Sequence, residues 1–448
     1  MKIERLTLTN FRGISHRSLS FHPEFNLIVG VNGVGKTSVL EALRVMLAHA
    51  IQMFAKAPRF NVEFDTDDLM RGADEMTVEL TFSCHDEGPY TYLVKKAAQS
   101  NIPNPTGGLR EQTTDTPGVR KLTHFARPGL TLSSGPPAFK SRADQPMGLH
   151  FSVSRSRATD ERSKVGRSTN PGYFGAFLTD RGLRVQDLVD WLRSKEEIAR
   201  EAPDGNSAQQ KMAVLQAITT MLPELSEWRL EDGQLWVTKQ VARQRIDESS
   251  PTRELRVVNE PMQLQVEELS DGERSLVVLG FDIGRRLAQL NPSDPTPTTN
   301  GQGVVLIDEI DLHLHPQWQR RIIASLTSAF PRIQFIATTH SPQVIGETPM
   351  GQAILLREDG TSEVLDESLG RDSGWILRHV MGTPERNARL QAGLDDIDRL
   401  MENGELAQAR ARVTALRAVF GDDKELIGAN AAIDRWEVLG DETDSEGQ

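Results

Sequence analysis

The chain has 448 residues, 38% of them hydrophobic and 25% charged, a composition typical of a folded protein with two or three domains. The net charge of −12 argues against a protein that coats nucleic acid along its whole surface. No segment approaches the ~18 consecutive apolar residues of a membrane span, and the N-terminus lacks the apolar block of a signal peptide. Because Cys84 is the single cysteine, we expect neither disulfide nor cysteine-based zinc site, and a cytoplasmic protein without a membrane partner.

The first elements predict a strand, a second strand, a glycine-rich loop and a helix, in that order. Apolar residues alternate from Ile3 to Phe11, which is typical of a strand. The apolar run Phe25–Val29 leads into the glycine-rich residues 30–37, and apolar residues then recur at helical spacing over 39–47. This order of elements is the one that a phosphate-binding loop requires.

The loop itself, Gly30-x-x-x-x-Gly35-Lys36-Thr37, matches the P-loop pattern. Its glycines let backbone N–H groups surround phosphate oxygens, and the following helix points the positive end of its dipole at them. We expect Lys36 to reach the β- and γ-phosphates of ATP and the Thr37 hydroxyl to bind Mg²⁺. The flanking strand and helix disfavour the alternative, a glycine-rich turn that happens to precede a lysine.

The middle of the chain combines strands, a loop-rich stretch and short helices. Residues 76–84 alternate as a half-buried strand, with 90–96 as its hairpin partner. Residues 97–147 are rich in Pro, Gly, Ser and Thr, which predicts a long mobile loop. Residues 101–170 hold 11 Lys and Arg against 5 Asp and Glu, which indicates a local basic patch on an acidic protein. Three more elements are expected: helices containing 185–192 and 212–222, and a hairpin at Asp232-Gly233.

Two later apolar runs end in polar side chains. Residues 304–307 end in Asp308-Glu309, and residues 333–337 end in a segment that contains His340. Buried parallel strands deliver such groups to their carboxyl edge, beside the P-loop. We expect Asp308 to hold Mg²⁺, and Glu309 to orient or deprotonate the attacking water. The plainer alternatives are a solvated acidic turn and a structural histidine.

Residues 269–274, with the sequence LSDGER, precede a helix expected from Glu273 to Leu290. Ser and Gly before a helix form a second natural site for an anion. One interpretation is a plain N-cap, supplied by Ser270 or Asp271. The other is that this helix end contacts a nucleotide phosphate.

Through this segment and the opening Asn10-Phe11-Arg12, the chain resembles the ABC-type ATPases of the SMC, RecF and OLD kind. The resemblance implies an α/β fold: an ABC-type P-loop head with an inserted helical and loop region, followed by a C-terminal helical hairpin domain. It also implies that two heads sandwich two ATP molecules. The candidate ATP-binding residues are then Arg12, Asn32, Gly33, Gly35, Lys36, Thr37 and Ser38.

The same resemblance implies roles for the later motifs. Ser270, Gly272 and Glu273 would face the γ-phosphate bound by the other subunit. Asp311 would lie in the loop that crosses the dimer interface, and His340 would sense the γ-phosphate.

One departure concerns the loop after the first helix, where the family places a Mg²⁺-contacting glutamine. Residues 65–69 offer acids instead, one of which is a candidate for that role. His313 and His315 lack a third ligand nearby, so they are interpreted as interface or packing residues and not as a metal site.

Several branches of this superfamily fit poorly. No heptad run lies between Lys36 and Ser270, which excludes a long coiled coil. The residues after Pro342 are mostly helical, and no nuclease site is expected; Asp396 and Asp398 are interpreted as a solvated face. Two apolar stripes, over 390–401 and 406–420, resemble a TPR-like hairpin. The hairpin either packs on the head or docks a partner.

Over nearly its whole length the chain resembles the PtuA-like ATPase subunit of Septu-type anti-phage systems, also found with some retrons. Residues 307–316, 338–344 and a short helical insert around Trp191 carry this resemblance. It implies an ATPase that forms a homo-oligomer, assembles with a separate HNH nuclease and meets DNA through that complex. Two alternatives remain: a RecF-like DNA-repair ATPase that binds DNA when ATP is bound, and a scaffold that binds ATP but seldom hydrolyses it.

The expected organisation follows from these motifs. We expect an N-terminal lobe of the head over 1–96, an insert over 97–260, a C-terminal lobe over 261–370, a helical domain for partner docking over 371–440 and an acidic tail over 441–448.

Overall fold

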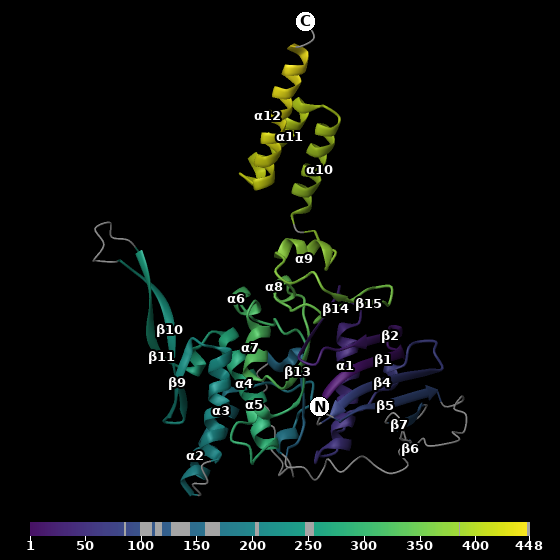
Figure 1. Cartoon of the computed structure of the whole chain (residues 1–448), viewed down its shortest axis with the longest axis vertical. Coiled ribbons are helices and arrows are strands. Elements are labelled where there is room, and N and C mark those ends of the chain that lie inside the picture. The colour runs from purple at the N-terminus through teal and green to yellow at the C-terminus, as the bar shows by residue number, and fades with distance from the viewer. Residues whose placement is uncertain are drawn as a thin grey trace. The chain divides into compact units, whose positions relative to one another are not determined.

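The computed structural model shown in Figure 1 divides into two compact units, Met1–Asp372 and Ser373–Gln448. The described residues are 1–84, 87–98, 110–112, 119–126, 144–156, 171–201, 206–246, 255–384 and 386–445. Among the helices of these residues, none has the length and apolar character that crossing a membrane requires.

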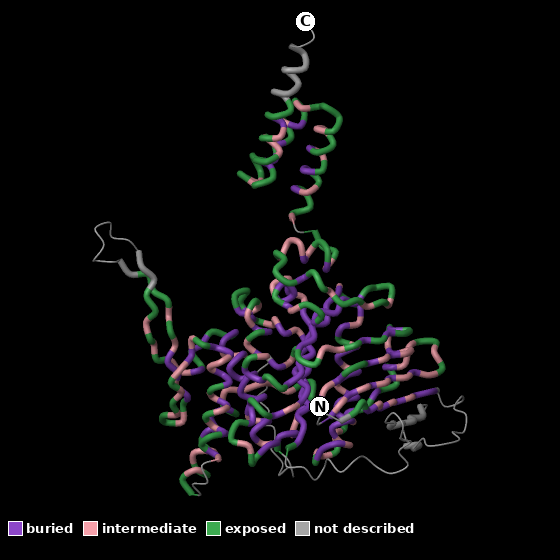
Figure 2. Tube along the Cα trace, viewed as in Figure 1, coloured by how far each residue is buried: buried purple, intermediate pink, exposed green. Residues whose placement is uncertain are grey.

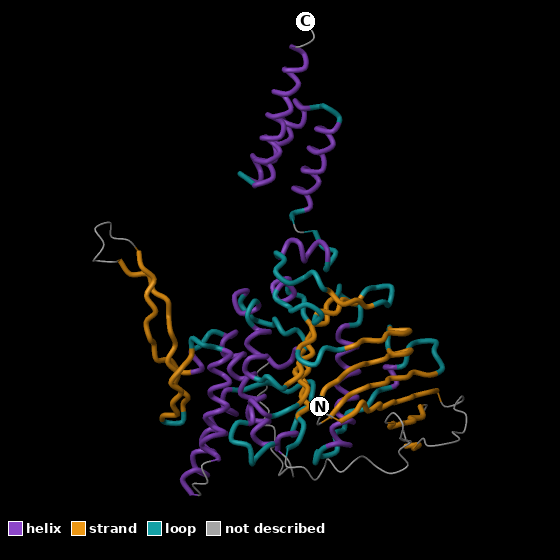
Figure 3. Tube along the Cα trace, viewed as in Figure 1, coloured by secondary structure: helices purple, strands orange, loops and turns teal. Residues whose placement is uncertain are grey.

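A six-stranded sheet in the order β15-β14-β3-β13-β12-β8 forms the centre of the first unit (Figure 3). The five strands from β14 to β8 are parallel, and β15 is antiparallel at one edge. Every residue of β3, β8, β12 and β13 is buried, as expected for parallel strands covered on both faces (Figure 2). The bounds are β3 Phe25–Val29, β8 Met147–Phe151, β12 Gly303–Ile307, β13 Ile333–Thr338, β14 Ala353–Leu356 and β15 Ser362–Leu365.

A second, antiparallel sheet has the order β2-β1-β4-β5-β7-β6. In β4, buried residues strictly alternate with partly exposed ones, which confirms the predicted half-buried strand, and Cys84 is buried at its end. The bounds are β1 Lys2–Phe11, β2 Ile14–Ser20, β4 Glu75–Cys84, β5 Glu87–Ala98, β6 Arg110–Gln112 and β7 Val119–Ala126.

Helix α1 (Lys36–Phe54) packs against both sheets. Phe54 makes edge-on ring contacts with Phe82 and Tyr90 of the antiparallel sheet. On the other side, a Cβ added to Gly148 of β8 would lie 2.9 Å from Ile51 Cγ1. The helix can therefore approach the parallel sheet this closely only because residue 148 has no side chain.

Helices and a three-stranded sheet, β11-β10-β9, complete the first unit. The predicted hairpin at Asp232-Gly233 is confirmed as the turn between β9 and β10. The strands are β9 Leu225–Glu231, β10 Gln234–Ile246 and β11 Leu255–Gln265. The helices are α2 Val185–Glu201, α3 Asn206–Met221, α4 Asp271–Leu290, α5 Pro297–Asn300, α6 Pro316–Gln319, α7 Ile322–Ala329 and α8 Pro342–Gly346, and the 3₁₀ turns are η1 Thr66–Asp68, η3 Val153–Ser156, η4 Pro171–Tyr173 and η5 Val266–Glu268.

A buried ion-pair network anchors α4. The Asp282 carboxylate accepts hydrogen bonds from Arg181 at 2.6 Å, Arg285 at 2.7 Å and Arg286 at 3.0 Å. Burial alone would raise the pKa of Asp282, but the three guanidinium groups hold that pKa well below its ordinary value. Arg286 is fully buried and also donates to two main-chain carbonyls at η4. Removing one charge from such a cluster leaves the others uncompensated.

Two parts of the middle region differ from the sequence-based expectation. The predicted insert over 97–260 contains β8, which pairs in parallel with β12 and belongs to the central sheet. Within the loop expected over 97–147, β6 and β7 extend the antiparallel sheet beside β5. Most of that loop, and most of the basic stretch 101–170, lies outside the described residues.

The described part of the second unit holds four helices, α9 Ser373–His379, α10 Ala388–Glu402, α11 Leu406–Phe420 and α12 Lys424–Ser445. The two predicted stripes face each other, and α12 completes their core. A Cβ on Gly393 would lie 2.6 Å from Leu416 Cδ1, so α10 and α11 pack closely at this glycine. Asp396 forms ion pairs with Arg399 and Arg412. The predicted acidic tail begins within α12, and residues 446–448 lie outside the described residues.

Candidate nucleotide-binding site

The glycine-rich loop joins β3 to α1, as the sequence predicts. Gly30, Gly33 and Gly35 have φ angles of +151°, +83° and +101°, a region that glycine enters without steric cost. A Cβ on Gly30 would lie 2.7 Å from the Leu356 carbonyl oxygen, so no side chain fits there. Asn32, Gly33 and Thr37 are exposed, and Ser38 is partly exposed. The loop therefore leaves one side of its backbone accessible to a ligand.

Lys36 lies between the loop and the acids that follow β12. Its Nζ donates to the carbonyl oxygens of Gly30 at 2.7 Å and Val31 at 2.9 Å. Burial lowers the pKa of Lys36, and the charges of Asp308 and Glu309 partly offset that shift. The structure thus brings the predicted lysine into electrostatic contact with both predicted acids.

Thr338, the last residue of β13, joins the two acids. Its hydroxyl donates to Asp308 Oδ1 at 2.6 Å and accepts from the Glu309 backbone N–H at 2.8 Å. Asp308 is buried and Glu309 is partly exposed, with a φ of +47°. Both acids lie at the carboxyl edge of the parallel sheet, where ligands of open α/β sheets bind.

His340 follows β13 at the same edge. Its pKa is lowered first by burial and then by Lys36, while Glu309, Asp311 and Asp308 act in the opposite direction. A neutral imidazole can donate one hydrogen bond and accept another. Asp311 is held by the Thr339 hydroxyl, which donates to its Oδ1 at 2.5 Å. The four predicted groups Lys36, Asp308, Glu309 and His340 therefore surround one small region.

The signature segment forms the N-terminus of α4. Ser270 is the N-cap: its Oγ accepts from the Glu273 N–H at 3.4 Å and donates to Glu273 Oε2 at 2.8 Å. Lys239 of β10 also donates to Glu273, at 2.8 Å. Burial favours a higher pKa for Glu273, but the hydrogen bonds from Lys239 and Ser270 lower that pKa below its ordinary value. A Cβ on Gly272 would lie 3.2 Å from the His313 carbonyl oxygen.

Of the two interpretations of Ser270, the structure therefore shows the N-cap of α4. The contact of Ser270, Gly272 and Glu273 with a phosphate on a second subunit stays a prediction.

Two of the acids in residues 65–69, Asp65 and Asp68, have structural hydrogen-bond partners. Asp68 accepts from Arg12 Nε at 2.8 Å through one carboxylate oxygen and from the Asp65 N–H at 2.7 Å through the other. Asp65 in turn caps η1 by accepting from the Thr66 N–H. Asp68 therefore holds both Arg12, which lies 56 residues earlier in the chain, and the backbone of the η1 turn. This role of Asp68 is structural.

His313 and His315 also have local structural places. His313 adopts a φ of +61°, and His315 caps α6 by accepting from the Gln317 N–H at 3.3 Å. Within the described part of the chain, no group of three His, Cys, Asp or Glu side chains is arranged to hold a metal ion.

Three residues around the site were missed by the sequence analysis. Arg155, in η3 just after β8, donates to the carbonyl oxygens of Asp308 and Glu309. Thr338 bridges the two acids, and Lys239 neutralises Glu273. Thr338 could have been found, because it occupies the end of a predicted strand. Arg155 and Lys239 carry no local signal, since each acts across a long stretch of sequence.

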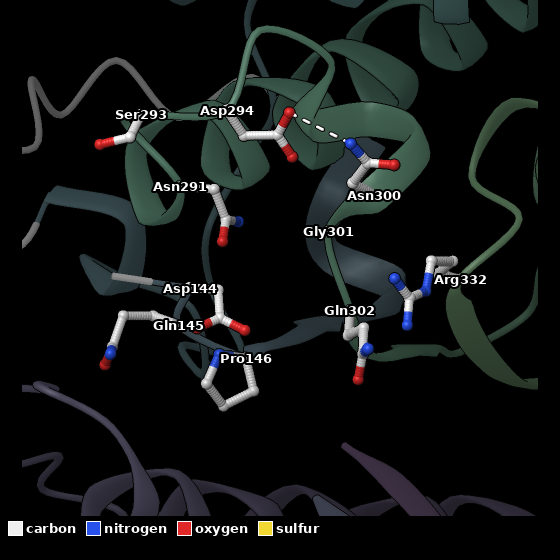
Figure 4. A pocket seen from close by; sticks show the side chains of 10 residues that line it. All are labelled: Asp144, Gln145, Pro146, Asn291, Ser293, Asp294, Asn300, Gly301, Gln302 and Arg332. Carbon is white, nitrogen blue, oxygen red and sulfur yellow. Dashed lines mark hydrogen bonds between the residues drawn. The ribbon is translucent and has the colours of Figure 1, made fainter. Parts of the chain in front are cut away.

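A pocket lies at the other edge of the parallel sheet, where Pro146 precedes β8 and Gln302 precedes β12 (Figure 4). Asp294 accepts from Asn300 at 3.2 Å on one wall of this pocket. The P-loop, Asp308 and His340 all lie at the carboxyl edge, so the pocket is separate from the candidate site. Its lining residues are Asp144, Gln145, Pro146, Asn291, Ser293, Asp294, Asn300, Gly301, Gln302 and Arg332.

Comparison with known proteins agrees with this geometry. A family described as "AAA ATPase domain" matches residues 1–91, and a family described as "AAA domain, putative AbiEii toxin, Type IV TA system" matches residues 240–346. The "Retron Vc95 probable ATPase" of Vibrio cholerae serotype O1 biovar El Tor is 26% identical over 80% of this chain and 74% of its own. "Septu protein PtuA" of Bacillus thuringiensis is 25% identical over 86% of this chain and 85% of its own.

Over most of its length, the chain is therefore similar to a retron ATPase and to a Septu PtuA protein. The parallel central sheet with its helices agrees with the predicted α/β fold. Among solved structures, the SMC head bound to the C-terminal winged-helix domain of ScpA aligns with a TM-score of 0.43 and 18% identity, over 82% of this chain and 98% of that one. The family matches cover the P-loop in one segment and the signature, the acids and His340 in the other, so the chain binds nucleotide as an ATPase.

Proposed function

We propose that two copies of this chain close face to face over two ATP molecules, and that the resulting dimer regulates a separate HNH nuclease in an anti-phage defence complex. The main support is the convergence of Lys36, Asp308, Glu309 and His340 at one edge of a single sheet. The similarity to a Septu PtuA protein and a retron ATPase supports the defence context.

The P-loop side would bind the triphosphate. Backbone N–H groups from Asn32 to Ser38 surround the phosphates, with Arg12 close by, and the Lys36 amino group exchanges its carbonyl partners for the β- and γ-phosphates. The exposed Thr37 hydroxyl and the Asp308 carboxylate are the oxygen ligands that Mg²⁺ prefers, so these two residues would hold the ion. The bound ion would offset charge that develops on the phosphates.

Glu309 and His340 would act on the chemical step. Glu309 accepts a hydrogen bond from the attacking water and orients it or takes its proton. His340, with its lowered pKa, is neutral at pH 7 and donates a hydrogen bond to the γ-phosphate. Ser270, Gly272 and Glu273 of the second copy complete the site, and Asp311 lies at the interface between the copies.

The second unit would dock the nuclease. Its α11 and α12 expose three large apolar side chains, with Val419 57%, Ile427 48% and Trp436 50% exposed. Exposed aromatic and aliphatic side chains of this kind are typical anchors of protein interfaces. DNA would be met through the assembled complex, since the chain as a whole is acidic.

The dimer is tested by trapping ATP in the full-length chain. Glu309→Gln keeps the shape of the side chain but cannot take a proton, so this variant should bind ATP, hydrolyse it slowly and elute as a dimer with ATP and Mg²⁺. A Glu309→Gln/Ser270→Arg double variant should bind ATP and remain monomeric, because a bulky side chain blocks the other subunit's phosphate. A monomeric Glu309→Gln protein with saturating ATP contradicts the proposal.

The nuclease partner is tested by co-purification. The wild-type chain, purified from its host, should retain an HNH nuclease, and Trp436→Ser/Ile427→Ser should lose that protein while keeping wild-type ATP turnover. Retention by this variant would exclude the apolar surface of α11 and α12 as the docking site.

A further inference from the structure

Arg155 is a buried cation whose hydrogen bonds go to the main chain. It is 6% exposed and lies in η3, directly after β8. Its guanidinium donates to the carbonyl oxygens of Ser152 at 3.1 Å, Asp308, and Glu309 at 2.5 Å. Two of these three carbonyls belong to the acids that would hold the metal ion and activate the water.

The backbone of Glu309 is held in a costly conformation. A φ of +47° is uncommon for a residue with a side chain, and such conformations cost about 1–3 kcal/mol. The N–H of Glu309 donates to the Thr338 hydroxyl at 2.8 Å, and its carbonyl accepts from the Leu312 N–H at 2.9 Å and from Arg155. Left-handed residues persist only where surrounding groups fix them in this way.

We propose that Arg155 is a positioning residue for ATP hydrolysis: by binding the carbonyls of Asp308 and Glu309, it holds the Glu309 carboxylate where water is activated. The inference rests on the proposed role of Glu309. Arg155 itself contacts main-chain oxygens, and it acts on the reaction only through the position of Glu309.

The charge of Arg155 adds a second contribution. Asp308, Asp311 and Glu309 all interact with its guanidinium electrostatically. Burial lowers the pKa of Arg155 to about 10 against the opposing effect of these acids, so the side chain stays charged near pH 7. A fixed cation behind the acids reduces their mutual repulsion and keeps them close together.

The chain offers a matched comparison in Arg17. This arginine is 4% exposed and likewise donates to three main-chain carbonyls, of Val34 at 3.0 Å, Arg357 at 3.0 Å and Gly360 at 3.2 Å. Val34 belongs to the P-loop. The two arginines therefore have similar surroundings, but one supports the loop that binds ATP and the other supports the residue that activates water.

The experiment measures kcat and KM for ATP in full-length Arg155→Met, Arg155→Lys and Arg17→Lys proteins, with thermal unfolding to verify folding. Arg155→Met should lower kcat about 10- to 100-fold and change KM less than about threefold, because positioning errors of an ångström have effects of this size. Arg155→Lys keeps the charge but has a single donor nitrogen in place of the two that Arg155 uses, so its loss of kcat should be smaller than that of Arg155→Met. Arg17→Lys should instead mainly raise KM.

A double-mutant comparison isolates the route of action. If Arg155 works through Glu309, then Arg155→Met in a Glu309→Gln background should lower the residual turnover by less than about twofold. A full additional loss in that background, or a raised KM with unchanged kcat, would overturn the inference. If Arg155→Met does not fold, the same two measurements are made on Arg155→Lys: kcat and KM of the single variant, and its residual turnover in the Glu309→Gln background. Unchanged turnover in Glu309→Gln alone would instead refute the proposed function.

Discussion

The P-loop and the signature segment are both helix N-termini near glycine, but their local hydrogen bonding differs. At the start of α1, three glycines with positive φ leave the loop open, and no acid lies in the first turn of the helix. At the start of α4, Ser270 and Glu273 bond to each other, and Asp271 adds a second acid in the first turn. One helix end is therefore preorganised for an anion, whereas the other is already satisfied by its own side chains.

The difference indicates what ATP must do at each end. In the proposed dimer, a phosphate at the P-loop would replace the carbonyls that now hold Lys36. At the signature, a phosphate bound by the second copy would have to compete with the Glu273 carboxylate for the Ser270 hydroxyl. Binding to one chain and closure of two chains are therefore separable steps, and the following substitutions test that separation.

The largest effect is expected at the P-loop. Lys36→Ala removes the cation that faces both the phosphates and the two acids, so ATP affinity should fall more than about 100-fold. Isothermal titration calorimetry with ATP and Mg²⁺ measures this affinity. In Ser270→Ala, at the other helix end, the single chain should bind ATP with wild-type affinity. Similar losses in both variants would contradict the separation of the two ends.

The next largest effect concerns the anchor of α4. Asp282→Asn leaves three arginines, one fully buried, without their counter-charge, and should reduce the free energy of unfolding by about 3–5 kcal/mol. Urea denaturation measures this loss. Because the pKa of Asp282 is depressed, its stabilising contribution is present above its unfolded pKa and is lost only as pH falls through the lower folded value. This contribution should therefore be constant from pH 8 to about pH 5.

A smaller effect is expected where the signature meets the loop after the acids. In Gly272→Ala, the new Cβ lies 3.2 Å from the His313 carbonyl oxygen, so one of the two segments must shift. We expect about a tenfold loss of ATP turnover with unchanged ATP affinity of the single chain. Gly428→Ala, in α12 with no atom within 4 Å of the new Cβ, is the control and should leave turnover unchanged. Loss of ATP affinity in Gly272→Ala would show that the segment acts on the chain's own nucleotide.

The smallest effect is expected at Lys239. Lys239→Met leaves the Glu273 carboxylate uncompensated beside Ser270, which should weaken ATP-dependent dimerisation a few-fold, roughly 1 kcal/mol. Analytical ultracentrifugation of the Glu309→Gln protein with ATP measures this. Adding Glu273→Gln removes the unpaired charge and should restore dimerisation. Failure of this rescue would mean that Lys239 supports β10 and not the signature.

The sequence alone predicts those site residues that can be recognised from their neighbours in the chain. The P-loop is recognisable because strand, glycines and helix follow one another, and Asp308 and His340 are recognisable because each ends an apolar run. Parallel strands bring such ends together, and no long-range information is needed. In the structure, the charges of Asp308 and Glu309 act on both Lys36 and His340.

The groups that sequence reasoning missed depend on contacts between distant residues. Arg155 reaches Glu309 only because β8 pairs with β12, and β8 has the short apolar sequence MGLHF without any motif. Asp68 was one of several acids of residues 65–69 considered for the role of the family's metal-contacting glutamine, and nothing local indicates its pairing with Arg12. Side-chain partners across tens to hundreds of residues are set by tertiary packing, which periodicity does not encode.

The order of strands in the parallel sheet has a consequence for biosynthesis. Both neighbours of β3, β13 and β14, lie about 300 residues later in the chain. At about 5–20 residues per second, a ribosome needs roughly 15–60 s to make that stretch. Throughout this time the apolar strand that leads into the P-loop has no partner for its backbone. The ATP site therefore forms only after β14 has been synthesised, and until then the nascent chain is exposed to chaperones and proteases.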